Sequence, residues 1–220
     1  MIHESARLLF GIAAILCATA GAESVQGQDM NAAIDRAVQK YSTVKTMRGS
    51  LQQTNRTMLG VHELAADFQQ QLPNLLSLRY TDPRGDMLIC DGKNTWMYFA
   101  DTKVANRYAM GEGGSVNLIG VFLDSPRTKF TLSDSGRKTI DSHVTRQIGL
   151  VPKQPMQEFR RAIVWIEEES GIVRQFEFTD KDGLVRRFRF ANNLQFNAPV
   201  DASQFKFTLP RGAKIVDGGK

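Results

Sequence analysis

The chain has 220 residues, of which 42% are hydrophobic and 23% are charged, and its formal net charge is +5. This length allows one domain or two small ones, and the composition is typical of a globular protein rather than a disordered or fibrous one. Only two cysteines are present, which excludes a scaffold held together by several disulfides. The fold must therefore rest on a hydrophobic core, which a chain of this size is able to bury.

The N-terminal segment has the pattern of a secretory signal peptide. Residues 8–20 are apolar or small, and Ala20-Gly21-Ala22 fits the small-residue cleavage pattern. The apolar run is too short for a comfortable membrane span, although a retained signal anchor is the alternative. We therefore expect residues 1–22 to be removed on export and residues 23–220 to form a single domain.

The first elements after this segment are a helix and a series of strands. Apolar residues recur at the spacing of one helical face over residues 29–44, with Asp29 in the position of an N-cap. After Thr46 the hydrophobic period changes to two, which indicates strands with one wet face. The expected strands lie near residues 47–52, 64–69, 76–80, 87–90, 96–99 and 104–108.

The middle of the chain has a different pattern. Residues 111–114 are rich in glycine, and Ser115 stands where it could cap a short helix over residues 116–123. Asp124-Ser125-Pro126 should end this helix. It is apolar on nearly every side, which is costly in water, so we expect it to be packed against something or able to lift off what it covers.

Strand patterns then return near residues 128–133, 143–151, 160–167, 172–179, 184–191 and 204–208. Short turns join consecutive strands, so the sheet should be antiparallel. The predicted fold class is α+β, with one curved sheet of about ten to eleven strands and two or three short helices. A concave face under a helical lid would bind acyl chains at about 0.8 kcal/mol per buried CH₂. The alternative is a dry, fully packed core.

The sequence offers little for catalysis. It has no metal-ligand spacing, no phosphate loop and no Gly-x-Ser-x-Gly elbow, so we expect no catalytic residue, cofactor or metal. Cys90 lies in an apolar strand run and is interpreted as a small buried hydrophobe. The run Glu167-Glu168-Glu169 is interpreted as a solvated hairpin turn. A secreted hydrolase that uses His143 with Asp141 is a further hypothesis, and it would need a nucleophile supplied by the fold.

The basic balance of the chain suggests a nucleic-acid partner at first. Arginines 186, 187 and 189 lie near Phe188 and Phe190, an interleaving that RNA binders use. Strand alternation, however, puts Arg187 and Arg189 on one face and both phenylalanines on the other, as in any half-buried strand. We therefore expect no nucleic-acid partner and a modest basic surface suited to acidic proteins or anionic headgroups.

Five short motifs follow one another along most of the chain. They are Met47-x-Gly49-x-Leu51-x-Gln53, Pro73-Asn74-Leu75-Leu76, Asp91-Gly92-Lys93-x-x-Trp96-x-Tyr98, Val151-Pro152-Lys153, and Val200-Asp201-x-x-x-Phe205-x-Phe207-x-x-Pro210-x-Gly212. Each motif is short, but their order and spacing together resemble the outer-membrane lipoprotein carrier protein family, the LolA-like proteins.

The resemblance implies a fold and a function. The fold is an incomplete, half-open β-barrel closed by a helical lid. The function is that of a monomeric periplasmic carrier, without enzyme activity, that takes triacylated lipoproteins from an inner-membrane ABC exporter to a possible outer-membrane acceptor. The alternative is a related half-barrel that binds another amphiphile or acts as an envelope sensor module.

The resemblance also implies site residues by position. The acyl-chain cavity should be lined by Leu51, Leu76, Leu78, Tyr80, Trp96 and Tyr98. The lid should carry Ile34, Val38, Leu118, Val121 and Phe122. A register error of one residue would move any strand position to the other face. The family usually has an arginine before the proline that holds the lid shut, and Leu72 stands there in this chain. Because leucine cannot supply a guanidinium, we expect a lid that is looser or latched differently.

Overall fold

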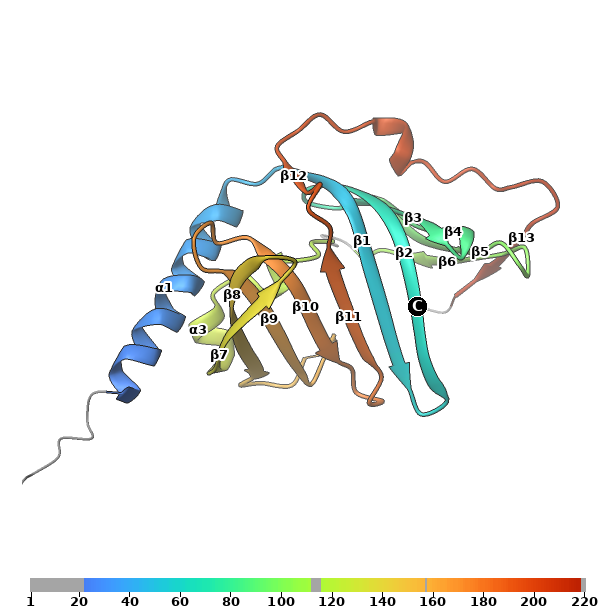
Figure 1. Ribbon diagram of the computed structural model, residues 1–220. Coiled ribbons are helices and arrows are strands. Elements are labelled where there is room, and N and C mark those ends of the chain that lie inside the picture. The colour runs from blue at the N-terminus through green and yellow to red at the C-terminus, as the bar shows by residue number, and fades with distance from the viewer. Residues whose placement is uncertain (1–21, 112–115, 157, 219–220) are drawn as a thin grey trace, which may run out of the picture.

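The computed structural model describes residues 22–111, 116–156 and 158–218 and is shown in Figure 1. Within these residues the chain forms a curved sheet of thirteen strands in the order β13-β6-β5-β4-β3-β2-β1-β11-β10-β9-β8-β7, with β12 paired to β1 off this path. The pairs are antiparallel except that β13 runs parallel to β6. The predicted fold class is therefore confirmed. The expected signal peptide lies almost entirely outside the described residues.

The strands come in hairpins along the chain. They are β1 (Thr46–Thr57), β2 (Gly60–Gln71), β3 (Leu75–Asp82), β4 (Arg84–Asp91), β5 (Asn94–Phe99), β6 (Val104–Ala109), β7 (Phe130–Ile140), β8 (His143–Pro152), β9 (Arg161–Glu167), β10 (Val173–Thr179), β11 (Val185–Phe190), β12 (Gln195–Phe196) and β13 (Lys214–Asp217). The count exceeds the expected ten to eleven because the short C-terminal strands β12 and β13 carry too few residues for a period of two to be recognised.

One long helix and several short ones accompany the sheet. They are α1 (Ala22–Ser42), α2 (Gly120–Leu123), α3 (Pro126–Lys129) and the 3₁₀ helix η1 (Ala202–Phe205). Figure 1 shows α1 beside β7 to β10, and it contacts α2 as well as β7, β8 and β9. None of the described helices is both long and apolar enough to cross a membrane.

Three expected elements differ from the structure. The first is the helix expected over residues 29–44, because α1 spans Ala22–Ser42 and Asp29 therefore lies inside it rather than at its N-cap. The helix expected over residues 116–123 starts only at Gly120, because the Asn117 side chain accepts the backbone N–H groups of Ile119 and Gly120. Pro126 opens α3, as proline at a first helical position does, besides following the end of α2. The strand expected near residues 204–208 is wrong, since η1 occupies Ala202–Phe205 and the Asp201 carboxylate accepts the Ser203 N–H at its start. Ser115 and residues 112–114 lie outside the described residues.

The two faces of the sheet are covered by different parts of the chain. The inner face is the one that α1 and α2 cover, and its side chains form the main hydrophobic cluster. The outer face is crossed by residues 191–213, which we call the C-terminal strap and which lead through η1 toward β13 (Figure 1). Strand register decides which side chains belong to which face.

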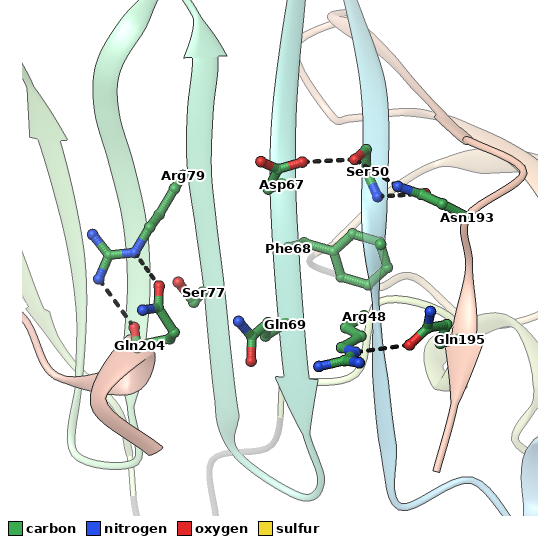
Figure 2. Close-up of a pocket in the computed structure, with 11 residues that line it drawn as sticks. Arg48, Ser50, Asp67, Phe68, Gln69, Ser77, Arg79, Asn193, Gln195 and Gln204 are labelled. Carbon is green, nitrogen blue, oxygen red and sulfur yellow. Dashed lines mark hydrogen bonds between the residues drawn. The ribbon is translucent and has the colours of Figure 1, made fainter. Parts of the chain in front are cut away.

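The strap is fastened to the outer face through polar side chains. Figure 2 shows Arg48 of β1 donating to Gln195 and Arg79 of β3 donating to Gln204, at 2.9 and 2.7 Å. A groove of about 280 Å³ lies between these contacts, and Ser50 and Asp67 hydrogen-bond to each other at its wall. Most of its lining residues are polar or charged, so this groove offers hydrogen-bonding groups rather than a continuous apolar wall.

Candidate functional site

The inner face is built around aromatic side chains from the C-terminal half of the sheet. Phe176 of β10 stacks on Phe188 of β11 with ring centroids 4.8 Å apart. From α2, Phe122 packs against Phe176 at 5.2 Å and against Phe159 at 5.5 Å. Aromatic pairs of this kind add to the free energy of burying their large apolar surfaces. The short helix is therefore held to the sheet mainly by ring contacts, in agreement with the expectation that it would be packed.

Four of the six residues expected to line a cavity lie together on this inner face. Leu51, Leu76 and Leu78 are buried in the main cluster, and Tyr80 packs against it. The Tyr80 hydroxyl donates to Gln53 Oε1 at 3.0 Å. Burial and the nearby Asp86 carboxylate raise the pKa of Tyr80 to about 12, so its hydroxyl stays neutral and available as a donor.

The other two residues lie on the outer face, and the expectation for Trp96 and Tyr98 is therefore wrong. The β4–β5 hairpin pairs Ile89 with Trp96 and Met87 with Tyr98, whereas Cys90 continues the inner face from Leu76. Trp96 stacks on Phe207 of the C-terminal strap at 4.7 Å. Trp96 and Tyr98 are two residues apart and share one face of β5, but the register of the hairpin turns that face away from the helices.

The expected lid residues all belong to the cluster on the inner face. Ile34 and Phe122 are fully buried there, and Val38, Leu118 and Val121 are partly buried against it. They come from α1, from α2 and from the segment just before α2. In this structure the helices are thus seated on the sheet and their apolar side chains fill the space above it.

Polar contacts fasten α1 at both ends. In the N-terminal half of α1, the Asp29 carboxylate accepts a hydrogen bond from Arg146 of β8 at 2.6 Å. Arg146 also contacts Asp134 and Glu168. Near its C-terminal end, the Tyr41 hydroxyl accepts the Val173 N–H at 3.2 Å. The lid helix is therefore held by an ionic contact between the half-exposed Asp29 and the buried Arg146, as well as by apolar packing.

The position before the proline does not hold the lid through its side chain, but its neighbours do. Gln70, almost completely buried at 2% exposure, donates from Nε2 to the Val116 carbonyl at 2.7 Å, and the Val116 N–H donates to the Pro73 carbonyl. Leu72 is half-buried and lines a small crevice beside Asn117. The signal for Gln70 was present in the sequence as a polar residue in the inward register of Ala66 and Phe68.

Removal of the Gln70 amide is expected to loosen the segment before α2. A Gln70→Met variant keeps the volume but cannot donate to Val116, and a lost hydrogen bond of this kind costs about 1 to 1.5 kcal/mol. Amide hydrogen exchange over residues 116–123 should accelerate by roughly tenfold in that variant. The control is Gln52→Met on the exposed side of β1. Equal exchange in both variants would show that Gln70 does not hold the lid.

The remaining candidates from the sequence are engaged in other contacts. Asp141 pairs with Arg189, while His143 Nδ1 lies 2.6 Å from Glu167, so the His143–Asp141 pairing is not formed. Glu167 also binds Arg174. The interpretation of the three consecutive glutamates as solvated is therefore wrong for the first two, because Glu168 binds Arg137 and Arg146. Only the third is exposed.

Two other interpretations are confirmed. Cys90 is buried at 2% exposure, and burial raises the pKa of its thiol, as expected for a small hydrophobe. Phe188 and Phe190 face the core, whereas Arg187 pairs with Glu177 at 2.6 Å on the opposite face. Among the residues that the structure describes, histidine, cysteine and acidic side chains do not gather in any group of three or more that could hold a metal ion.

An open sheet whose inner face is closed by helices defines a lid-covered half-barrel. The family model described as outer membrane lipoprotein carrier protein LolA matches residues 42–208. The chain belongs to this family, which confirms the resemblance drawn from the five motifs.

Individual relatives are distant. An uncharacterized protein of Methanocaldococcus jannaschii is 28% identical over 200 residues, which are 87% of this chain and 56% of that relative, so the chain spans little more than half of its length. An outer-membrane lipoprotein carrier protein of Pectobacterium carotovorum is 28% identical over 163 residues, 71% of this chain and 73% of the relative. The crystal structure of an uncharacterized conserved protein from Thermus thermophilus shares the fold, with a TM-score of 0.52, 14% identity and coverage of 87% of this chain and all of that one.

Proposed function

We propose that this protein is a periplasmic carrier that shelters the acyl chains of lipoproteins on its inner face. The observation that carries the proposal is the apolar cluster between the sheet and the helices, in which Phe122 of α2 packs on Phe176 of β10. The family to which the chain belongs supports the choice of lipoproteins as cargo. The proposed lining is Leu51, Leu76, Leu78 and Tyr80, without Trp96 and Tyr98.

The lid helices and the acyl chains of the cargo would compete for the same apolar site on the sheet. In the closed form, Ile34 and Phe122 occupy the space that acyl chains would fill. Each methylene sheltered from water contributes about 0.8 kcal/mol, but opening the lid costs the contacts that α1 and α2 make with the sheet. The net binding free energy is the difference between these two terms, so it is smaller than the free energy of burying the acyl chains alone. This lowered affinity allows the cargo to be released when the lid closes again.

The direction of transport belongs to the same proposal. A protein with a cleaved signal peptide would take its cargo from an inner-membrane ABC exporter and deliver it to an outer-membrane acceptor as a monomer, with no enzymatic step. Such a role does not require the lid helices to be held permanently closed over the inner face. The polar fastening by Gln70 and the ionic fastening by Asp29 and Arg146 instead give the lid two defined contacts that can open and re-form.

Site-directed photocrosslinking tests which face meets the acyl chains. The photoreactive residue p-benzoylphenylalanine replaces Tyr80 on the inner face in one variant and Trp96 on the outer face in a matched variant. Both positions hold aromatic side chains, so the benzophenone replaces an aromatic ring in each variant. A labelled triacylated lipopeptide should crosslink to the Tyr80 variant at least about tenfold more than to the Trp96 variant, since the main apolar cluster lies on the inner face.

The result can contradict the proposal in two ways. Equal labelling at the two positions, or labelling at position 96 alone, would remove the inner face as the acyl site. Equal crosslinking by the lipopeptide and by an ordinary diacyl phospholipid would make the protein a general amphiphile binder. The transport step is then read separately, as release of labelled lipoprotein from spheroplasts that hold the cognate exporter.

A further inference from the structure

The tip of the β1–β2 hairpin exposes large apolar side chains without covering them. Met58 is 104% exposed, Leu59 is 96% exposed and Val61 is 58% exposed. Figure 1 shows this hairpin at the middle of the sheet, with its turn at the end of two long strands. Burying apolar side chains is favourable, so a cluster of them held fully in water indicates a contact surface.

The register explains why the tip stands clear of the sheet. On one side, the pairing of β1 with β11 ends at Arg56 and Val185. On the other side, the pairing of β2 with β3 begins only at Ala65 and Asp82. Residues 57–60 therefore project beyond both neighbouring strands, and residues 61–64 of β2 project beyond β3.

We propose that this hairpin tip inserts into the surface of a lipid bilayer. The tip offers three apolar side chains, which is far less than the roughly 1,200 Å² that a specific protein–protein interface buries. A few apolar side chains at the headgroup boundary are, in contrast, enough for weak and reversible membrane binding. A lipid surface also needs no shape complementarity to a turn this narrow.

Charge and hydrogen bonding at the tip agree with a lipid partner. The turn itself, residues 57–60, carries no charged side chain, and the flanking Arg56 and Glu63 offset each other, so no net negative charge opposes contact with a lipid surface. The turn satisfies polar groups internally, since Leu59 N donates to Thr57 Oγ1 at 3.0 Å and that hydroxyl donates to the Gly60 carbonyl. Insertion therefore leaves fewer unpaired backbone groups in the apolar layer.

This surface is separate from the proposed cargo site. The tip lies at the end of the hairpin, beyond the inner-face residues Leu51 and Phe68. Contact with a membrane would bring the half-barrel to the bilayer whatever amphiphile it holds. Variants at the tip are accordingly expected to leave crosslinking of the lipopeptide at Tyr80 unchanged.

Vesicle flotation tests the proposal with purified protein and liposomes of mixed phosphatidylcholine and phosphatidylglycerol. The wild-type protein should float with the vesicles, and a Met58→Ser/Leu59→Ser double variant should bind about tenfold less, in line with the apolar surface removed. A Val151→Ser variant, at a 52% exposed apolar residue of β8, is the matched control and should bind like the wild type. All proteins are prepared with the same N-terminus, so that residues 1–22 contribute equally.

Three results would overturn the proposal. They are no flotation of the wild-type protein, equal flotation of the double variant, and binding only to vesicles that contain membrane proteins, which would make the tip a protein-docking element. A fluorophore attached at Val61→Cys in a Cys17→Ser background gives a second reading, since Cys90 is buried. Its emission should shift to the blue when the tip enters the bilayer, and an unchanged spectrum on bound vesicles would exclude insertion.

Discussion

Replacement of Gly171 by alanine is expected to push the lid helix α1 away from the sheet. Gly171 lies in the turn between β9 and β10 with a φ of +71°, and a Cβ atom there would lie 2.6 Å from Arg36 C and 2.9 Å from Ala37 N. These are backbone atoms in the middle of α1, so no side-chain rotation relieves the clash. The helix approaches this closely because Ala33 and Ala37 face the sheet.

The expected cost combines two effects. A left-handed backbone at a non-glycine residue costs about 1 kcal/mol, and overpacking against a helix backbone adds about 1 to 3 kcal/mol. Urea unfolding should therefore show a loss of about 2 to 4 kcal/mol. Binding of an environment-sensitive apolar dye should rise at the same time, because the inner face is no longer sealed by α1.

Gly136→Ala is the matched control for this experiment. Gly136 has a similar φ of +81°, but its added Cβ would meet no atom within 4 Å. Only the backbone cost of about 1 kcal/mol applies there. If both variants lost the same stability and neither bound the dye, the close approach of α1 to the β9–β10 turn would not matter for closure.

Loss of the Arg146 side chain is expected to destabilise the protein by about 2 to 3 kcal/mol, since it removes a buried cation from three acids that are themselves only partly buried. The Arg146 side chain is only 4% exposed, and its nitrogens lie 2.6 to 3.3 Å from carboxylate oxygens of Asp29, Asp134 and Glu168. In Arg146→Ala these acids would face one another with one cation fewer. The weakened anchor of α1 should also raise amide exchange in that helix.

The comparison variant is Arg127→Ala. Arg127 of α3 also reaches α1, where it bonds to Asp35 at 2.8 Å, but the two side chains are 45% and 65% exposed. An exposed pair of this kind contributes about 0 to 1 kcal/mol. Urea unfolding measures the loss of stability in each variant and so compares the contact of Arg146 with that of Arg127. A difference between the two losses below about 1 kcal/mol would contradict the special role of Arg146.

Much of the fold could be predicted because strand and helix periods are local properties. The positions of β8 to β11 follow from alternation, and so does the division of Phe188 from Arg187. The C-terminal region was harder to predict from the sequence, because β12 and β13 are short and η1 depends on the capping contact at Asp201. Such contacts leave little periodic signal.

The residues of the candidate site could be predicted from the sequence only in part. The predicted residues of β1 and β3 lie together on the inner face, whereas Trp96 and Tyr98 lie on the outer face. Alternation shows that two residues share a face but does not show which face it is. Gln70 was missed because its partner Val116 is 46 residues away. Arg146 was missed for the same reason, with Asp29 lying 117 residues away.

By itself, the amino-acid sequence determined the α+β class, the antiparallel order of short strands and the apolar character of α1 and α2, because these depend on residues close together along the chain. Only the tertiary structure decided that Trp96 faces Phe207, that Gln70 and Arg146 fasten the lid, and that Gly171 lies against α1. The physical reason is that strand register and helix docking are set by packing between distant segments, where a shift of one residue reverses a face.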